Sequence, residues 1–171
     1  MKNIEPERLQ QLLEIIQPAP MQRIGHFSDG GQVMVEALSE FCKDKEYEYI
    51  LNCTDEDFYD GSADIYSNKE WVKIKNFDLN RRGYLLHGKF YEYLFVSSVI
   101  PIKSRESFLQ KSHKSIKNAG LIILFVPKND YARIEEWSRL LEENYFVATN
   151  TIDIFENYEL IISKKMHGWG G

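Results

Sequence analysis

Segments typical of β-strands alternate with segments typical of helices along nearly the whole sequence. The strand-like segments before the last helix are residues 21–27, 47–53, 71–77, 91–100 and 121–127. The apolar middle of residues 91–100 is nearly unbroken, as in a strand covered on both faces. Strands that alternate with helices predict a parallel sheet with right-handed crossovers and helices on both faces.

The last two strand-like segments, residues 146–155 and 158–166, are separated by only two residues. So short a link cannot cross over between parallel strands, and the two segments are therefore expected to pair as an antiparallel hairpin. The fold class predicted is α/β, with a doubly wound, seven-stranded, mostly parallel sheet that ends in a C-terminal antiparallel hairpin.

Helical spacing of apolar residues predicts the connecting elements. Residues 5–17 carry leucine and isoleucine at the i, i+3, i+4, i+7 spacing of an amphipathic helix. Further helices are expected after the glycines at 30 and 31 and over 104–118 and 131–144, with Ser104 as a cap of the second and Ala119-Gly120 at its end. The acidic stretch 54–68 is expected to form a surface loop, with a short helix as an option.

Length and composition fit one domain over residues 1–171, with 43% hydrophobic and 27% charged residues. A net charge of -5 disfavours a broad nucleic-acid-binding surface, because that affinity comes from clustered Lys and Arg. Cys42 and Cys53 fall in a predicted helix and strand and are expected to be small buried hydrophobes. No apolar run approaches the ~20 residues of a membrane span, and the charged N-terminus is unlike a signal peptide, so a cytoplasmic location is expected.

Residues 90–129 resemble part of the class I S-adenosylmethionine (SAM)-dependent methyltransferases, from their fourth strand through a helix to a lysine-proline-glycine-glycine turn and the fifth strand. Lys117-Asn118-Ala119-Gly120 stands at that turn. The terminal hairpin agrees with the same family. The resemblance implies a Rossmann-like methyltransferase fold and SAM as cofactor.

The loop "RIGHFSDGG" resembles an acidic-Ile-Gly-Thr-aromatic-Thr-Gly loop of one methyltransferase branch. Two residues depart from it: Arg23 stands at the usual acid and Asp29 at the second glycine. Asp29 either shifts the close backbone contact with the cofactor or relies on the glycines after it, and its carboxylate could meet the cofactor's ammonium group. The resemblance implies cofactor binding by Gly25, Phe27, Ser28, Asp29, Gly30 and Gly31.

The other cofactor residues implied by the resemblance follow the next three strands. Asn52 or Asp55 would bind the ribose hydroxyls, and the sequence does not choose between them. Asp78 matches the position that bonds the adenine amino group. Ser97, with Ser98, lies on the floor where the methyl group would be presented.

The remaining polar residues favour structural interpretations. The acidic residues 55–60 lack the spacing of an EF-hand, and the four histidines lack zinc-site spacing, so no metal site is expected. His113 is expected on a solvent-facing helix surface and His87 near the rim of the site, where it is a weak candidate for a base. The tail around Trp169 is expected to make structural or dimer contacts.

The function implied by the resemblance is a SAM-dependent methyltransferase acting on a small-molecule acceptor, with no catalytic residue assigned. The Asp/Asn-Pro-Pro-Tyr sequence of amino methylation is absent after residue 96, which favours an oxygen or carbon acceptor. The acceptor would bind in an open cleft or at a homodimer interface, with no membrane or nucleic-acid partner. The alternative is a binding or assembly protein that kept the scaffold and lost catalysis, an interpretation motivated by Arg23 and Asp29.

Overall fold

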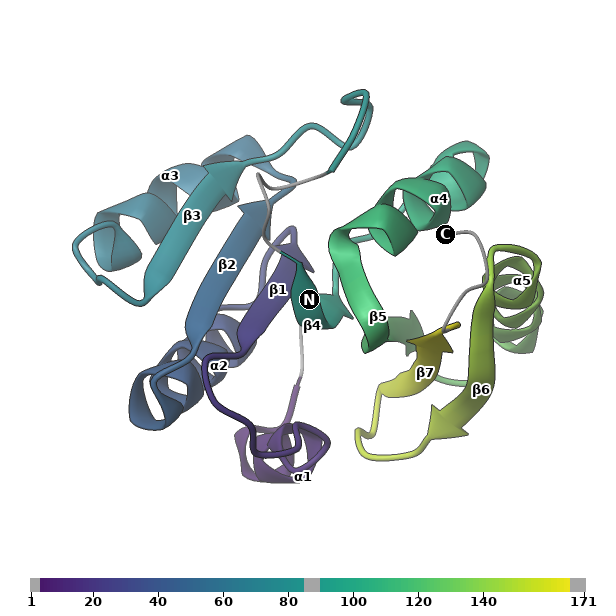
Figure 1. The fold of residues 1–171 in the computed structure, drawn as a ribbon, viewed down its shortest axis with the longest axis horizontal. Coiled ribbons are helices and arrows are strands. Elements are labelled where there is room, and N and C mark those ends of the chain that lie inside the picture. The colour runs from purple at the N-terminus through teal and green to yellow at the C-terminus, as the bar shows by residue number, and fades with distance from the viewer. Residues whose placement is uncertain (1–3, 85–89, 167–171) are drawn as a thin grey trace.

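A seven-stranded sheet with the order β3-β2-β1-β4-β5-β7-β6 forms the centre of the protein (Figure 1). The structure is a computed structural model that describes residues 4–84 and 90–166, so His87 and Trp169 lie outside the described residues. The strands are β1 (Arg23–Ser28), β2 (Glu48–Cys53), β3 (Val72–Asn76), β4 (Tyr91–Val96), β5 (Ile116–Pro127), β6 (Phe146–Ile152) and β7 (Tyr158–Lys165).

The pairing of the strands confirms the predicted mixed sheet. β1 pairs in parallel with β2 and β4, β2 with β3, and β4 with β5. β7 is antiparallel to both β5 and β6. The pairing with β6 follows from the short turn between the two strands, which returns the chain along β6. The strand order reverses between β1 and β4, and crevices at such reversals are where open α/β sheets bind ligands.

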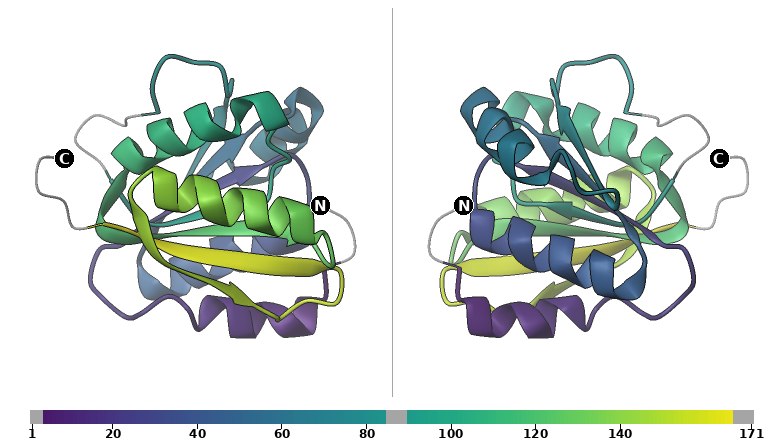
Figure 2. Two further views of the ribbon diagram at one scale, coloured as in Figure 1. Left: turned by 90° about the vertical axis from the view of Figure 1, so that its right-hand side faces the viewer. Right: turned by 90° about the vertical axis from the view of Figure 1, so that its left-hand side faces the viewer.

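Helices cover both faces of the sheet, and Figure 2 shows α4 and α5 on one side and α1 on the other. The α-helices are α1 (Leu9–Leu13), α2 (Gln32–Lys45), α3 (Glu56–Tyr66), α4 (Arg105–Ser115) and α5 (Tyr131–Glu143). Short 3₁₀ turns, Pro6–Arg8 and Ile102–Ser104, precede α1 and α4.

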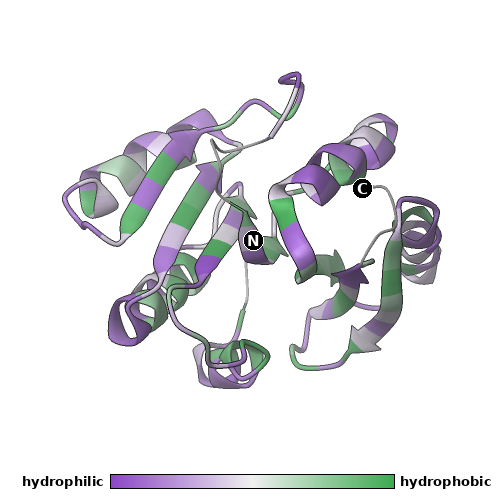
Figure 3. Ribbon diagram, in the orientation of Figure 1, coloured by the Kyte–Doolittle hydropathy of each residue, from purple (hydrophilic) through white to green (hydrophobic). Residues whose placement is uncertain are grey.

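The sheet separates two hydrophobic cores. Tyr49 and Leu51 of β2 pack with α1 and α2 on one face, whereas Ile50 belongs to the core under α4 and α5. This division follows from the period of two in a strand, which sends successive side chains to opposite faces. In Figure 3 the central strands carry hydrophobic residues between hydrophilic ones, whereas hydrophilic residues predominate along α4.

The acidic stretch after β2 is mainly a helix, so the surface loop predicted there is wrong and the helix given as an option is the one that forms. Asp55 caps α3 by accepting a hydrogen bond from the Phe58 N–H at 2.8 Å. Two acidic residues in the first turn also stabilise the helix by interacting favourably with its dipole. Ser62 and Tyr66 are buried, and Phe58 packs against the core. The spacing of these three residues makes one buried stripe, which the acidic composition obscured.

The turn expected at Lys117-Asn118-Ala119-Gly120 is an irregular part of β5 instead of a loop. Strand β5 begins at Ile116, directly after α4, and its pairing with β4 shifts register between Tyr91 and Tyr93. Ala119 has φ 65°, and a Cβ on Gly120 would lie 2.8 Å from the Lys117 carbonyl oxygen. The turn that the family resemblance implied is therefore present only as an irregularity within β5.

Three smaller expectations have mixed outcomes. Ser104 makes no side-chain hydrogen bond that caps α4 in the described structure, whereas Cys42 and Cys53 are buried and unpaired, as predicted. His113 is half-buried instead of solvent-facing, with its ring 5.2 Å from that of Phe146. Within residues 4–84 and 90–166, no helix is long and apolar enough to cross a membrane.

Candidate functional site

The carboxyl ends of β1, β2 and β4 are joined by backbone hydrogen bonds. The N–H of Thr54, after β2, donates to the Ser28 carbonyl at 2.9 Å. The N–H groups of Ser97 and Ser98, after β4, donate to the Phe27 carbonyl at 2.9 and 3.1 Å. The segments that follow three strands therefore meet at the switch point.

A glycine turn links β1 to α2 at this edge. The Ser28 hydroxyl donates to the Gly30 carbonyl at 2.6 Å and accepts from the Gly30 N–H at 3.3 Å. Gly31, the N-cap of α2, has φ 92° and ψ 69°, a left-handed conformation that a residue without a Cβ adopts freely. Among the described residues no side chain caps α2, so its first N–H groups are suited to a negative or polar ligand group.

Gly25 and Phe27 lie inside β1 and not in this turn. A Cβ on Gly25 would lie 2.7 Å from the Tyr91 ring, so the glycine makes room for that ring on the sheet face. Phe27 is buried, with its ring 5.2 Å from that of Phe108. Packing accounts for both residues. A motif match alone does not show whether a matched residue lies inside a strand or in a turn.

Arg23 lies at the amino end of β1, the opposite end from the switch point. Its backbone N–H donates to the Glu92 carboxylate, and its Nε donates to Glu48 at 3.3 Å. The residue that departs from the family's acid is therefore part of a charge network away from the strand ends that form the candidate site.

The segment after β4 is fixed by side chains that directly follow β1 and β2. The hydroxyl oxygens of Ser98 and Thr54 are 2.7 Å apart, and the Val99 N–H donates to the Asp29 carboxylate at 2.9 Å. Asp29, the second departure from the family loop, thus holds the β1 turn to the segment after β4. This segment is a rigid floor for the site.

His26 is a buried residue of this floor to which sequence analysis assigned no role. It is fully buried in β1, its Nδ1 is 2.7 Å from the Tyr49 hydroxyl, and its Nε2 is 2.7 Å from the Ser97 hydroxyl. The two partners lie 23 and 71 residues away along the sequence, so no local spacing could have indicated the chain of contacts.

Hydrogen-bond satisfaction orients the protons along the Tyr49–His26–Ser97 series of contacts. If Tyr49 donates to Nδ1, then Nε2 donates to Ser97, and the Ser97 hydroxyl donates onward to the Phe27 carbonyl at 3.3 Å. Burial, with a smaller effect of the N-terminal charge, lowers the pKa of His26 to about 3. A histidine that stays neutral near pH 7 is too weak a base to activate Ser97 as a nucleophile. The role of these hydrogen bonds is therefore to position the Ser97 hydroxyl.

Asn52 and Asp55, the alternatives for the ribose, have different environments. Asn52 is buried at the end of β2, where its Nδ2 donates to the Tyr91 hydroxyl at 3.3 Å and its Oδ1 has no partner among the described residues. Asp55 is exposed and serves as the cap of α3. Asp78, just past β3, is exposed and accepts from the Asn80 N–H at 2.9 Å.

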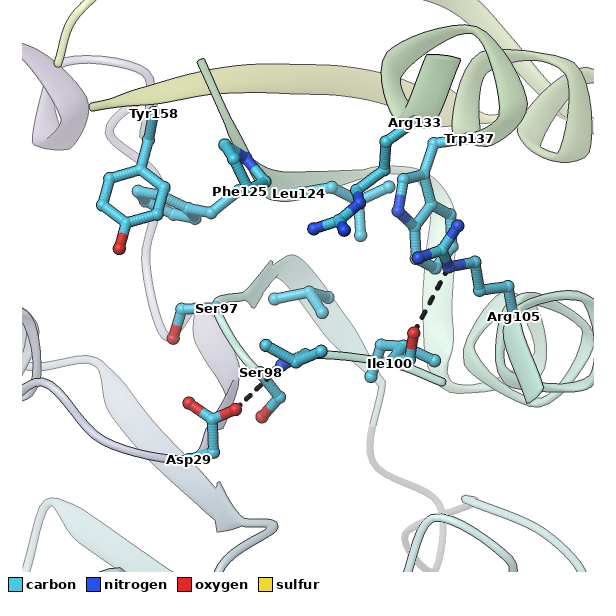
Figure 4. Close-up of a pocket in the computed structure, with 13 residues that line it drawn as sticks. Asp29, Ser97, Ser98, Ile100, Arg105, Leu124, Phe125, Arg133, Trp137 and Tyr158 are labelled. Atoms are coloured by element: carbon cyan, nitrogen blue, oxygen red, sulfur yellow. Dashed lines mark hydrogen bonds between the residues drawn. The ribbon is translucent and has the colours of Figure 1, made fainter. Parts of the chain in front are cut away.

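A cavity of about 160 Å³ opens beside the floor, between the carboxyl ends of β4 and β5 (Figure 4). Asp29 and the two serines line one side, and Arg105 and Arg133 come from α4 and α5 on the other. Sequence analysis missed both arginines, because only the tertiary fold brings these helices to the strand ends. Among the described residues, no three His, Cys, Asp or Glu side chains are grouped to hold a metal ion.

No model of a protein family and no curated protein matches this sequence. Solved structures do match. A SAM-dependent O-methyltransferase from Thermotoga maritima aligns with a TM-score of 0.76 and 14% identity, over 100% of this chain and 69% of that chain. N-methyltransferase NodS from Bradyrhizobium japonicum aligns with a TM-score of 0.68 and 10% identity, over 94% of this chain and 93% of its own.

Human N-acetylserotonin methyltransferase, crystallised in complex with SAM, aligns with a TM-score of 0.71 and 10% identity over 92% of this chain. The chain spans about half the length of some of these proteins, 51% of the human enzyme and 52% of the CurJ carbon methyltransferase. At such low identities the likeness describes architecture, and it agrees with the strand order and the antiparallel β7. The chain has the fold of the class I SAM-dependent methyltransferases.

Proposed function

We propose that this protein is a SAM-dependent methyltransferase of a small-molecule acceptor, with its cofactor at the carboxyl ends of β1, β2 and β4. The observation that carries the proposal is the left-handed Gly31 at the start of α2, which presents uncapped N–H groups at the switch point within the described structure. The solved neighbours with this fold, one of them in complex with SAM, support SAM as the cofactor.

The residues at the strand ends fit such a cofactor. The unpartnered Asn52 Oδ1 is an acceptor suited to a ribose hydroxyl, and a buried acceptor without a partner costs about 1–3 kcal/mol that a bound donor would offset. Asp78, exposed past β3, is the candidate for the adenine amino group. When bound, the cofactor supplies a methyl group already activated on a sulfonium.

The protein's own contribution is positioning. The floor formed by Ser97, Ser98 and Val99 is held by side chains from β1, the glycine turn and the segment after β2, so an acceptor placed on it meets a fixed surface. Fixed orientation of two reacting groups lowers a barrier without an obligatory nucleophile in the chain. The printed names of the neighbours include carbon, oxygen and nitrogen methyltransferases, so the fold by itself does not determine the acceptor atom.

The alternative, a scaffold that lost catalysis, was motivated by two departures from the family loop, and the position of one of them no longer supports it. Arg23 lies at the far end of β1, where it does not oppose a cofactor. Asp29 is the remaining departure, and its carboxylate holds the Val99 N–H. The alternative therefore rests on Asp29 alone.

Calorimetric titration with S-adenosylhomocysteine tests the proposal. We expect one binding site in the native protein and an affinity reduced by roughly tenfold or more in Gly31→Ala, because a Cβ strains the left-handed N-cap. Gly61→Ala is the matched control, since Gly61 lies in α3 with nothing within 4 Å of an added Cβ. No heat of binding to the native protein at millimolar ligand would remove the enzyme proposal.

A further inference from the structure

We propose that the cavity between β4 and β5 binds the methyl acceptor through a carboxylate group, and that Arg133 is the residue that recognises this group. That the bound molecule is the methyl acceptor rests on the proposed function, whereas binding of a carboxylate in the cavity does not.

Arg105 is occupied with structural contacts. It is 4% exposed, its Nε donates to the Ile100 carbonyl at 3.3 Å, its Nη1 pairs with Glu136, and its guanidinium lies 5.4 Å from the centre of the Trp137 ring. The charge of Arg105 is therefore already balanced. Its contacts fasten the start of α4 to α5 and to the segment after β4.

Arg133 is different, because its contacts leave the end of the guanidinium directed into the cavity (Figure 4). Its Nε lies 3.2 Å from Asp130 Oδ2, in a pair whose side chains are each 34% exposed. Asp130 also caps α5, by accepting from the Arg133 N–H. Among residues 4–84 and 90–166 no acceptor is found for the two terminal nitrogens, and a planar pair of N–H groups matches a carboxylate.

The pair with Asp130 does not cancel the affinity of Arg133 for an anion. A partly exposed ion pair between the N-cap and the first turn of one helix contributes little, because solvent screens it. A carboxylate enclosed in the cavity would interact with Arg133 in a less screened environment and through two parallel hydrogen bonds. Arg133 thus has the position and the free geometry of an anion-recognition residue.

The rest of the cavity fits a compact, largely apolar acceptor body. Leu124, Phe125 and Trp137 form apolar walls, and the volume of about 160 Å³ is below the 300–1,000 Å³ of clefts for drug-sized ligands. Asp29 lies on the other side of the cavity from Arg133 (Figure 4). A negative group is therefore drawn to the Arg133 side of the cavity, which leaves the opposite end of the acceptor beside the glycine turn, where the cofactor is proposed.

Binding of simple acids tests the recognition directly. The probes are benzoate, phenylacetate and butyrate, each beside its primary amide, titrated into the native protein and followed by amide chemical shifts in NMR. We expect at least one acid to bind with shifts at the floor and α5, and its amide to bind roughly tenfold more weakly. Arg133→Gln should remove the difference between acid and amide. Arg139→Gln, the control, removes an exposed arginine of the same helix that pairs with Glu143 and should leave the difference intact.

Three results would overturn the proposal. One is that acids bind no better than amides, or that none of the three binds. Another is an equal loss in Arg139→Gln, because the effect would then come from net charge. The third is that Arg133→Gln weakens binding of S-adenosylhomocysteine but not of 5′-methylthioadenosine, which lacks the amino-acid half, since the carboxylate would then belong to the cofactor. Acid binding without any binding of S-adenosylhomocysteine would uphold Arg133 as a carboxylate site and refute the proposed function.

Discussion

At the scale of single residues, the candidate site depends on contacts that the sequence does not encode locally. His26 joins Tyr49 of β2 to Ser97 after β4, and each bond crosses to a neighbouring strand. Gly25 shows the reverse limit: the family resemblance implied that it binds the cofactor, but in the structure it lies inside β1, beneath the Tyr91 ring. The strand and the glycine turn after it could be predicted from the sequence, whereas the packing of Gly25 against β4 could not.

The neutral state of His26 leads to a prediction about pH. Burial lowers its pKa from 6.5 to about 3. Between these two pH values His26 is protonated in the unfolded chain and neutral in the folded chain. The stability from this group is complete above pH 6.5 and falls as the pH drops toward 3, by about 1.4 kcal/mol per pH unit. Urea unfolding from pH 7 to 4 should therefore show a steeper loss in the native protein than in His26→Gln, which has no titrating ring.

A measurement on the native protein keeps this prediction testable if His26→Gln fails to fold. The His26 ring signals in NMR should stay at their neutral positions down to about pH 4. A midpoint of titration near 6.5 for His26 would contradict the burial and the hydrogen bonds described for it.

At the scale of elements, the sequence predicted every strand of the sheet and its terminal hairpin, because the spacing of strand and helix patterns extends over many residues. The helix α3 was expected only as an option beside a surface loop, because its acidic composition is typical of loops, although Phe58, Ser62 and Tyr66 form a stripe that faces the core. The start of β5 was missed for a related reason, since its pairing with β4 outweighs the turn-forming Asn118-Ala119-Gly120. Tertiary packing decides such cases and local propensity does not.

The ends of β2 and α3 allow the ribose alternatives to be separated. Asp55→Ala removes the cap of α3 and should lower the free energy of unfolding by about 1 kcal/mol while leaving the affinity for S-adenosylhomocysteine unchanged. Asn52→Ala should weaken that affinity by about 1–3 kcal/mol, because it removes the unpartnered acceptor proposed for the ribose. Calorimetry gives the affinities and urea unfolding the stabilities. The opposite pattern, with affinity lost in Asp55→Ala alone, would assign the ribose to Asp55.

At the scale of the whole molecule, one sheet lies between two cores, and the candidate site draws on strands that border both of them. Strands β1 and β2 contribute to the core with α1 and α2 and also to the core under α4. A ligand at the ends of these strands therefore interacts with the folded protein as a unit. Its binding energy adds to the stability of the entire chain, because the site does not exist when the sheet is unfolded.

This coupling predicts a thermal shift. At a concentration of S-adenosylhomocysteine about 100 times its dissociation constant, binding adds about 2.7 kcal/mol, which for a chain of this length raises the melting temperature by roughly 5–11 °C. Gly31→Ala should lose about half of the shift or more at the same ligand concentration, because a tenfold weaker affinity leaves about 1.4 kcal/mol of the binding term. Gly61→Ala should keep the shift, because Gly61 lies in α3 with room for a Cβ, whereas Gly31 has the left-handed conformation at the site. Scanning calorimetry with and without ligand measures the effect. An equal shift in all three proteins would place the ligand away from the glycine turn, even if it binds tightly.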